Sequence, residues 1–456
     1  GIVTEIGSGT GNNQYTNGRK NGDDLFRYEG IVTIAQTAGL SGILNGAYRS
    51  GDSSSLLPLD AVQEFNTATM PKAEDGWKEG STISIGIKSG TNVLHGTAYA
   101  FGRNAQATDA RNAFDTTGKA TPAELEQFGA TASGPIMKDK LFWFAGYEGL
   151  RMTLKGVSNF KIPTSTSTGD AVTSMVDACK AIKAANPGAG INAVNELSAN
   201  LSGLDRTNCV VTPRSATVNN LFPYNDSGST SFHPDLSSNG PLNNGVFKGD
   251  YAPTANHHLS GSFFRSRNTS IFNTDIGQIR PEWRNEIINR VDVSTAAWTW
   301  VVNPHVVNDL RWGLAYFNNQ TGLLDGDMNP ADTWPKGYGM NTGVTNPNYF
   351  GLPTITITGF GAGTTLLGVG TNGPTIRGPE GNWSIIDSVS YLRGNHAFKF
   401  GVEFVNILFD QGLGGNIRTS TAGQIPFDSL QDFLKGNVTA AGGRILTGHF
   451  RAALCE

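Results

Sequence analysis

The chain has 456 residues, of which 58 are glycine and only 16% are charged, and its formal net charge is -4. It contains no block of Lys and Arg, which argues against nucleic acid as the partner, and no run of about 18 apolar residues, which excludes a membrane-spanning helix. Gly, Asn, Ser and Thr crowd the turns. The composition therefore favours a mainly β protein with many short strands and long polar loops.

The first 90 residues mix glycine-rich turns with short apolar pieces. GSGTG at 7–11 is not followed by Gly-Lys-Ser/Thr, so we interpret it as a flexible turn rather than a phosphate-binding loop. TISIGIK (82–88) alternates in side-chain character, which predicts a strand. The polar turn Ser89-Gly90-Thr91-Asn92 comes next and leads into a second predicted strand, HGTAYAF (95–101).

Further strands are predicted in two zones, up to residue 152 and again from 246. The first zone holds QFGATASG (127–134) and KLFWFAGYEGL (140–150). The second zone holds longer alternating segments and a hairpin around Arg393-Gly394-Asn395; these segments are 257–268, 290–302, 305–319 and 382–409. Short turns thus join the strands in pairs.

Two long segments interrupt this pattern. Residues 153–245 are rich in Ser, Thr, Asn and Pro, with one helix predicted within 168–186, and residues 320–380 are rich in Gly, Asn and Pro. A mostly structureless insertion of this length is unusual in a compact domain, whereas a membrane barrel permits it as an extracellular loop. Cys179 and Cys209 lie in the first segment, where a disulfide would form outside the cytoplasm; two unpaired thiols are the alternative.

One face of each predicted strand is consistently apolar. In 399–409 the apolar face carries Phe400, Val402 and Phe404, and the opposite face carries Lys399, Gly401, Glu403 and Val405. A soluble sandwich would bury that apolar face, and a transmembrane barrel would turn it toward lipid. Alternation alone does not choose between them, but long strands with short turns on one side and long loops on the other favour the barrel.

No motif predicts catalysis, a cofactor or a metal. Neither G-x-S-x-G nor H-E-x-x-H occurs. The adjacent His257 and His258 would face opposite sides of a strand and so would not share a metal. Glu148 and Asp387 lie in predicted strands as rim or lumen charges.

A calcium-loop spacing at Asp325, Asp327 and Asn329 is incomplete. Pro330 and Lys336 stand where such a loop needs Gly and a bidentate Glu, so we predict an Asx-rich loop there. The clustered aromatic residues could stack on sugar rings, but an interfacial girdle or a packed core explains them more simply; they include Phe142, Trp143, Phe144, Trp298, Trp300, Trp312 and Tyr316.

Several segments occur in the order of one known family. LPLDAVQEFNTAT (57–69), 82–104, DARNAF (109–114) and 127–151 resemble the Oar-like TonB-dependent outer-membrane receptors. Residues 12–31 are similar to that family's plug segment, with Tyr28-Glu29-Gly30 where the family has Leu-Asp-Gly. Four later segments are similar to successive barrel segments: HLSGSFFRSRN, NPHVVNDLRWGLAYF, LRGNHAFKFGVEF and FDSLQDFLKG.

The resemblance implies a domain organisation. Residues 1–93 would be a partial plug of small α/β type, and 94–456 the N-terminal portion of an antiparallel transmembrane β-barrel, with extracellular loops at about 153–245 and 320–380. The turn that hands over from plug to barrel would be formed by Ser89, Gly90, Thr91, Asn92 and Gly96. Only about nine or ten barrel strands are predicted, against the 22 of this class, so we expect an incomplete barrel and a fragment that does not close alone.

The resemblance also implies a function. The protein would be an outer-membrane receptor that takes up a large ligand, a saccharide, a peptide or a metal chelate, through plug movement. Its partners would be TonB with the inner-membrane energising complex, outer-membrane lipid and an unknown extracellular ligand, with no nucleic acid, no cofactor and no enzymatic activity. The alternative is a non-transporting surface or secreted β-rich adhesin or polysaccharide-binding scaffold.

Overall fold

The structure is a computed structural model. It describes residues 2–6, 12–16, 25–33, 47–48, 52–53, 57–69, 82–104, 123–155, 159–224, 229–234, 236–272, 279–361, 367–368, 375–376, 380–409 and 424–439, with residue 235 omitted. GSGTG, DARNAF and Cys455 lie outside the described residues. No helix within these ranges is both long enough and apolar enough to cross a membrane.

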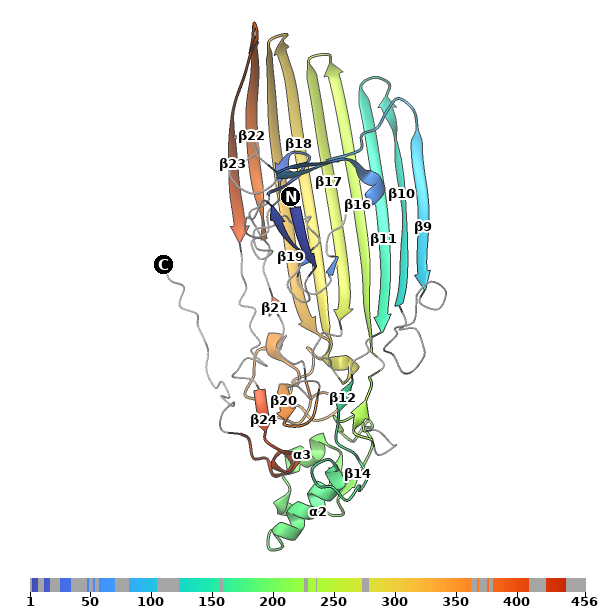
Figure 1. Ribbon diagram of the computed structural model, residues 1–456, viewed down its shortest axis with the longest axis vertical. Coiled ribbons are helices and arrows are strands. Elements are labelled where there is room, and N and C mark those ends of the chain that lie inside the picture. The colour runs from blue at the N-terminus through green and yellow to red at the C-terminus, as the bar shows by residue number, and fades with distance from the viewer. Residues whose placement is uncertain are drawn as a thin grey trace, which may run out of the picture.

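One large antiparallel sheet, called here the main sheet, dominates the molecule (Figure 1). Its strands follow the order β23-β22-β19-β18-β17-β16-β11-β10-β9, and β21 (Thr375–Ile376) also pairs with β19. Their bounds are β9 (His95–Asn104), β10 (Ala123–Met137), β11 (Leu141–Lys155), β16 (Ser237–Thr254), β17 (His257–Phe272), β18 (Asn285–Asn303), β19 (Val306–Leu323), β22 (Glu380–Arg393) and β23 (His396–Phe409).

The mainly β prediction is confirmed, and each strand segment predicted from 95 to 409 lies in a strand of this sheet. The strands run further than alternation indicated. β16 begins at Ser237 and β19 ends at Leu323, inside the spans predicted as loops. The reason is that Ser, Asn and Gly at these ends give no apolar alternation, while backbone pairing continues regardless, as between Lys155 and Ser237.

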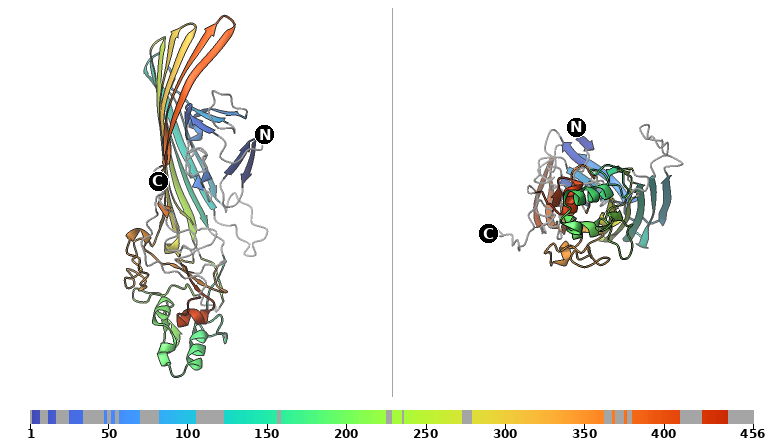
Figure 2. Two further views of the ribbon diagram at one scale, coloured as in Figure 1. Left: turned by 90° about the vertical axis from the view of Figure 1, so that its left-hand side faces the viewer. Right: turned by 90° about the horizontal axis from the view of Figure 1, so that it is seen from below.

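The two faces of the main sheet differ in polarity. The outer face carries exposed apolar side chains on β16, β19 and β23, at Phe247, Trp312, Phe400, Val402 and Phe404. Val402 is 65% exposed and Phe400 63% exposed, so nothing in the described chain covers them. The inner face carries polar and charged side chains together with buried apolar ones, and it is partly covered by the N-terminal elements, which lie on one side of the sheet (Figure 2).

The N-terminal sheet is a four-stranded unit that packs against this inner face. It has the order β4-β3-β8-β7, with β3 (Leu25–Tyr28), β4 (Ile31–Val32), β7 (Val62–Ala68) and β8 (Thr82–Ile87). Tyr28 and Ile87 are buried in one core with residues of the main sheet, among them Phe264 and Val293. Two small hairpins also lie in this region: β1 (Ile2–Ile6) with β2 (Asn12–Thr16), and β5 (Ala47–Tyr48) with β6 (Asp52–Ser53).

The long connections fold together into a distal lobe, at the end of the main sheet opposite its short turns (Figure 1). We define it as the described residues within 159–234, 279–284, 324–368 and 424–439. Its helices are α2 (Met175–Ala185), α3 (Glu196–Leu201) and α4 (Leu430–Lys435). Its strand pairs are β12 (Phe160–Lys161) with β15 (Ser231–Phe232), β13 (Leu204–Asp205) with β14 (Val210–Val211), and β20 (Thr354–Ile357) with β24 (Gln424–Phe427).

The distal lobe corrects the expectation of structureless loops. One buried cluster joins residues from all its segments, including Ile182, Trp283, Leu352 and Phe433. FDSLQDFLKG, which resembles a barrel segment of the family, lies in this lobe and contains α4, capped by the Ser429 hydroxyl. These contacts link positions far apart in the sequence, so local composition could not reveal them.

Candidate functional site

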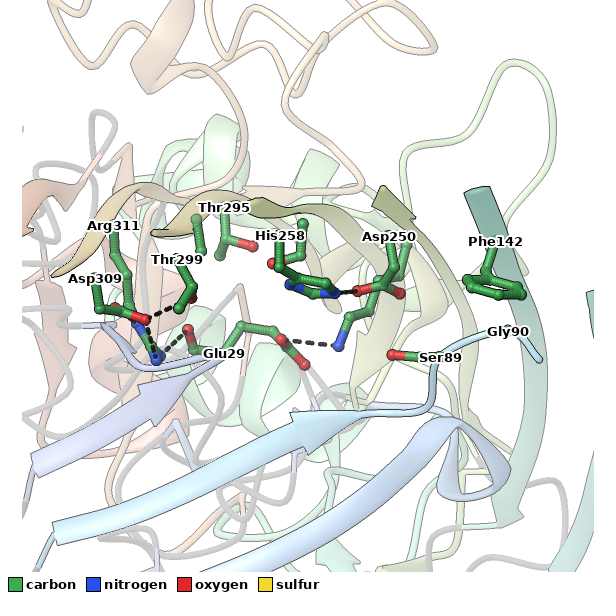
Figure 3. Close-up of a pocket in the computed structure, with 13 residues that line it drawn as sticks. Glu29, Ser89, Gly90, Phe142, Asp250, His258, Thr295, Thr299, Asp309 and Arg311 are labelled. Atoms are coloured by element: carbon green, nitrogen blue, oxygen red, sulfur yellow. Dashed lines mark hydrogen bonds and ion pairs between the residues drawn. The ribbon is translucent and has the colours of Figure 1, made fainter. Parts of the chain in front are cut away.

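A polar cavity of about 370 Å³ lies between the N-terminal sheet and the inner face of the main sheet (Figure 3). One wall is the β3–β4 turn with the segment after β8, and the other is formed by β11 and β16 to β19. The lining residues are Glu29, Ser89, Gly90, Phe142, Lys248, Asp250, His258, Ser260, Thr295, Ala297, Thr299, Asp309 and Arg311.

The β3–β4 turn places Glu29 in the cavity. Glu29 has φ 51° and Gly30 has φ 79°, both in the left-handed region that favours glycine. A Cβ at Gly30 would also overlap the Arg311 guanidinium. Glycine at 30 therefore allows an arginine of the main sheet to pack directly on the turn.

Buried polar contacts join the turn to the main sheet. The Lys248 ammonium lies 3.0 Å from Glu29 Oε2 and donates to Ile87 O at 3.0 Å, and both charged side chains are largely buried. The Ile87 amide donates to Glu29 Oε1 at 2.5 Å. Arg311 donates to Glu29 O at 3.2 Å and pairs with Asp309 at 2.5 Å. Breaking such a buried pair would leave an uncompensated charge, so these contacts hold the two sheets in register.

Further contacts extend this interface beyond the cavity. Arg27 Nη2 binds Glu403 Oε1 and Oε2 at 3.1 and 2.9 Å. Asn382 Nδ2 donates to Val32 O at 2.8 Å. At the other edge of the main sheet, Thr97 Oγ1 donates to Asp60 Oδ2 at 2.6 Å. Side chains from both edges of the main sheet thus bind the N-terminal elements.

Asp250 is a buried carboxylate of the cavity with an incomplete set of partners among the described residues. It is 6% exposed, and its Oδ2 has no hydrogen-bond partner in the part of the chain that the structure describes. Its Oδ1 lies 3.9 Å from His258 Nε2, beyond hydrogen-bond distance. Figure 3 shows the Asp250 carboxylate and the His258 ring directed toward one another.

The predicted hand-over residues lie between β8 and β9. Ser89 and Gly90 line the cavity, and a Cβ at Gly90 would overlap Trp143 O and come within 2.9 Å of Gly134 O. Thr91 Oγ1 donates to Val93 O, and Asn92 exchanges hydrogen bonds with Asp139 in the turn between β10 and β11. Gly96 lies within β9, where a Cβ would meet Thr131 O at 3.0 Å.

Cys179 and Cys209 are joined by a disulfide in the distal lobe. Cys179 belongs to α2 and Cys209 follows β13, and both are buried in the lobe core. Nearby, Arg280 donates to the carbonyls of Asn220, Leu221 and Phe222, and burial lowers the pKa of its guanidinium to about 10. These contacts stabilise the lobe from within.

The histidines and the aspartate that the sequence analysis considered as metal ligands make other contacts in the structure. His257 stacks on Trp298 and Trp300 of the outer face, while His258 faces the cavity. Asp325 is buried and accepts from Leu352 N at 2.8 Å and from the Tyr338 hydroxyl. Within the described ranges, no group of three or more His, Cys, Asp or Glu side chains could hold a metal ion.

Two more carboxylates weighed from the sequence are hydrogen-bonded. Glu148 accepts from the Tyr99 hydroxyl and from Gln127 Nε2, and it lies on the inner face outside the cavity. Asp387 accepts from Asn308 Nδ2 at 2.6 Å.

Sequence reasoning missed the residues that make the cavity, above all Glu29, Lys248, Asp250 and Arg311. Strand alternation places Lys248 and Asp250 on one face, and Arg311 and Asp309 on one face, so a polar inner face could have been predicted. Their partners could not, because Lys248 and Glu29 are separated by 219 positions.

Comparison with known proteins places the chain among outer-membrane proteins. Residues 86–452 match the model of the family described as outer membrane beta barrel domain. The chain is 29% identical over 156 residues to the TonB-dependent transporter Oar of Myxococcus xanthus, covering 32% of this chain and 13% of that protein.

Two solved structures are similar in fold. One is the outer membrane transporter YddB from Escherichia coli, with TM-score 0.48, 9% identity, 89% of this chain and 44% of that chain covered. The other is the siderophore receptor PirA from Acinetobacter baumannii, with TM-score 0.47, 10% identity and coverage of 89% and 44%. The chain therefore spans less than half the length of each relative.

Proposed function

Because this chain belongs to the outer membrane beta barrel domain family, we propose that it acts in TonB-dependent uptake of a large ligand across the outer membrane. The observation that carries the proposal is the N-terminal sheet bound by buried ion pairs to the polar face of an antiparallel sheet whose opposite face is apolar. Such an arrangement suits a barrel wall with lipid outside and a movable plug inside.

In this proposal residues 1–93 are the plug and 94–456 belong to the barrel. Residues Ser89 to Asn92 connect the plug to the barrel, and Gly90 lies close to backbone atoms of β10 and β11. The short turns face the periplasm, where TonB acts, and the distal lobe faces the exterior, where the ligand is captured. Saccharides, peptides and metal chelates are the ligand classes proposed.

Work done by TonB on the plug must overcome the contacts described above. The polar contacts, Lys248–Glu29, Arg27–Glu403 and Arg311–Glu29, can be exchanged for water as the plug moves, whereas the apolar core that Tyr28 and Ile87 share with the main sheet must be separated. A binding-and-transport role therefore fits the interface, with the energy supplied by the inner-membrane complex.

Uptake by the native host tests the proposal. A strain lacking the gene would be grown with defined oligosaccharides, peptides or ferric chelates as the sole carbon, nitrogen or iron source, beside its parent and a complemented strain. We expect the deletion to abolish growth on one ligand class, and a protonophore to block uptake of that ligand by the parent.

Unchanged growth on all three classes, with loss of surface attachment instead, would replace the transport proposal by the adhesin or scaffold. Uptake that resists the protonophore would also contradict coupling to TonB.

A further inference from the structure

We propose that the cavity between the two sheets binds an ammonium group, with Asp250 as its anionic anchor. The ligand class is a solute with a primary amine on an aliphatic stem, such as the side chain of a basic peptide. This inference rests on the proposed function only for the idea that the bound solute is cargo.

The described side chains that line the cavity include one more carboxylate than permanent cations. Among the described residues that line the cavity, three carboxylates face two permanent cations, and each cation has its own partner: Lys248 with Glu29 and Arg311 with Asp309. Asp250 is the third carboxylate. The cavity is therefore negatively charged while His258 is neutral.

The surroundings of Asp250 point to a missing donor. A carboxylate that is 6% exposed normally accepts several hydrogen bonds, because desolvating an unpaired charge is costly. Here Oδ2 has none in the described chain, and Oδ1 has only the His258 ring at 3.9 Å. His258 is half exposed, so its ring can turn aside and admit a stronger donor to Oδ1.

The rest of the cavity fits an amine on a carbon stem. Hydroxyl oxygens of Ser260, Thr295 and Thr299 can accept hydrogen bonds from the remaining ammonium N–H groups, and Phe142 provides an apolar wall at the end near Gly90 (Figure 3). The volume of about 370 Å³ is at the small end of the range for ligand pockets. It therefore suits one side chain of a larger ligand rather than a whole chelate.

The test is an isothermal titration calorimetry experiment on the purified, detergent-solubilised full-length protein. The probes are N-acetyl-lysine amide and its uncharged analogue N-acetyl-norleucine amide. We expect saturable binding of the lysine probe and at least about tenfold weaker binding of the norleucine probe, because only the former makes a charge-assisted hydrogen bond. This comparison uses the unaltered chain and so does not depend on a variant folding.

Two variants locate the site. Asp250→Asn should weaken the lysine probe at least about tenfold and, without ligand, raise the melting temperature, because it removes an unpaired buried charge. Glu148→Gln is the control, a buried carboxylate on the same face but outside the cavity, and should leave binding unchanged.

Equal binding of both probes, no saturable binding of the lysine probe, or equal losses in the two variants would overturn the ammonium site. None of these results depends on TonB or on uptake, so they test the ammonium site independently of the transport function, which the growth experiment tests.

Discussion

Lys248 is a side chain of the main sheet that directly contacts the N-terminal sheet. Its ammonium group contacts a carboxylate and a backbone carbonyl of the N-terminal elements, and only 9% of the side chain is exposed. A lysine in such a place is stabilising only while its partners are present, because removing one member of a buried pair leaves the other charge uncompensated.

Lys248→Met should destabilise the docking of the N-terminal sheet by roughly 3 kcal/mol, since Glu29 is left buried without its cation. Thermal unfolding in detergent and limited proteolysis of the first 90 residues would measure the change. The double variant Lys248→Met/Glu29→Gln should recover part of the loss, and Lys180→Met, at an exposed position of α2, should have no effect. If the double variant is as unstable as the single one, packing of the lysine stem rather than its charge holds the interface.

Gly90 allows the segment that connects β8 to β9 to pack closely on the main sheet. An added Cβ there would meet backbone atoms of Trp143 and Gly134, which cannot move aside as a flexible side chain can. Gly90→Ala should therefore cost about 1–3 kcal/mol through overpacking. Gly102→Ala in β9 is the matched control, because a Cβ at that position meets nothing within 4 Å. Equal melting temperatures for the two variants would show that the connection is not packed against the sheet as described.

The disulfide is the covalent link within the distal lobe. Cys179→Ala/Cys209→Ala should destabilise the lobe by about 2–4 kcal/mol, because the bond closes a long loop and lies in the lobe core. Protease resistance of residues 159–236, compared with and without reductant, would report the loss. Cys455→Ala is the control for thiol removal alone. A lobe equally resistant in both forms would mean that the apolar core suffices without the bond.

Acid should weaken the start of α2. Asp177 accepts from the Ser167 hydroxyl and from the amides of Thr168 and Gly169, and these hydrogen bonds lower the pKa of its carboxyl. A carboxyl with a lowered folded-state pKa stabilises the fold above its unfolded pKa, and this contribution is lost as the pH falls below about 4. Asp177→Asn should flatten the acid limb of the lobe's stability, measured by circular dichroism. If the stability of the variant fell with decreasing pH as much as that of the unaltered protein, other carboxylates would be responsible for the loss of stability in acid.

The whole molecule is organised by the contrast between the two faces of the main sheet. If the outer face meets lipid, a charge near the middle of a strand should be excluded from it, while the same charge on the inner face should be tolerated. Val402 and Val405 of β23 offer this comparison on one strand, because Val405 shares a face with Glu403, which binds Arg27 of the N-terminal sheet.

Val402→Arg, expressed from the native gene, should reduce the amount of folded protein in the outer membrane, at a cost of about 2–4 kcal/mol if the residue lies near the bilayer midplane. Val405→Arg should not. Heat-modifiable gel mobility of the outer-membrane fraction measures both. Equal losses would indicate that both faces of the strand are packed, as in a soluble sandwich.

The sequence by itself determined most strands of the main sheet, the faces of the last of them and one helix. A period of two in side-chain character is a local property, and it identified the two faces of β23 without knowledge of any contact. The helix predicted within 168–186 is α2, which begins where Ser174 caps the amide of Asp177. The resemblance to the receptor family added the expected assignment of these segments to a plug and a barrel.

Only the tertiary structure decided how the long connections fold and where the charges meet. The distal lobe is built from segments separated by whole hairpins, and the cavity joins Glu29 to Lys248 across 219 positions. Alternation states which face a side chain takes but not which distant residue lies opposite. That Asp250 has no donor at Oδ2 among the described residues is visible only once both walls of the cavity are in place, because burial and hydrogen bonding are properties of the assembled interface.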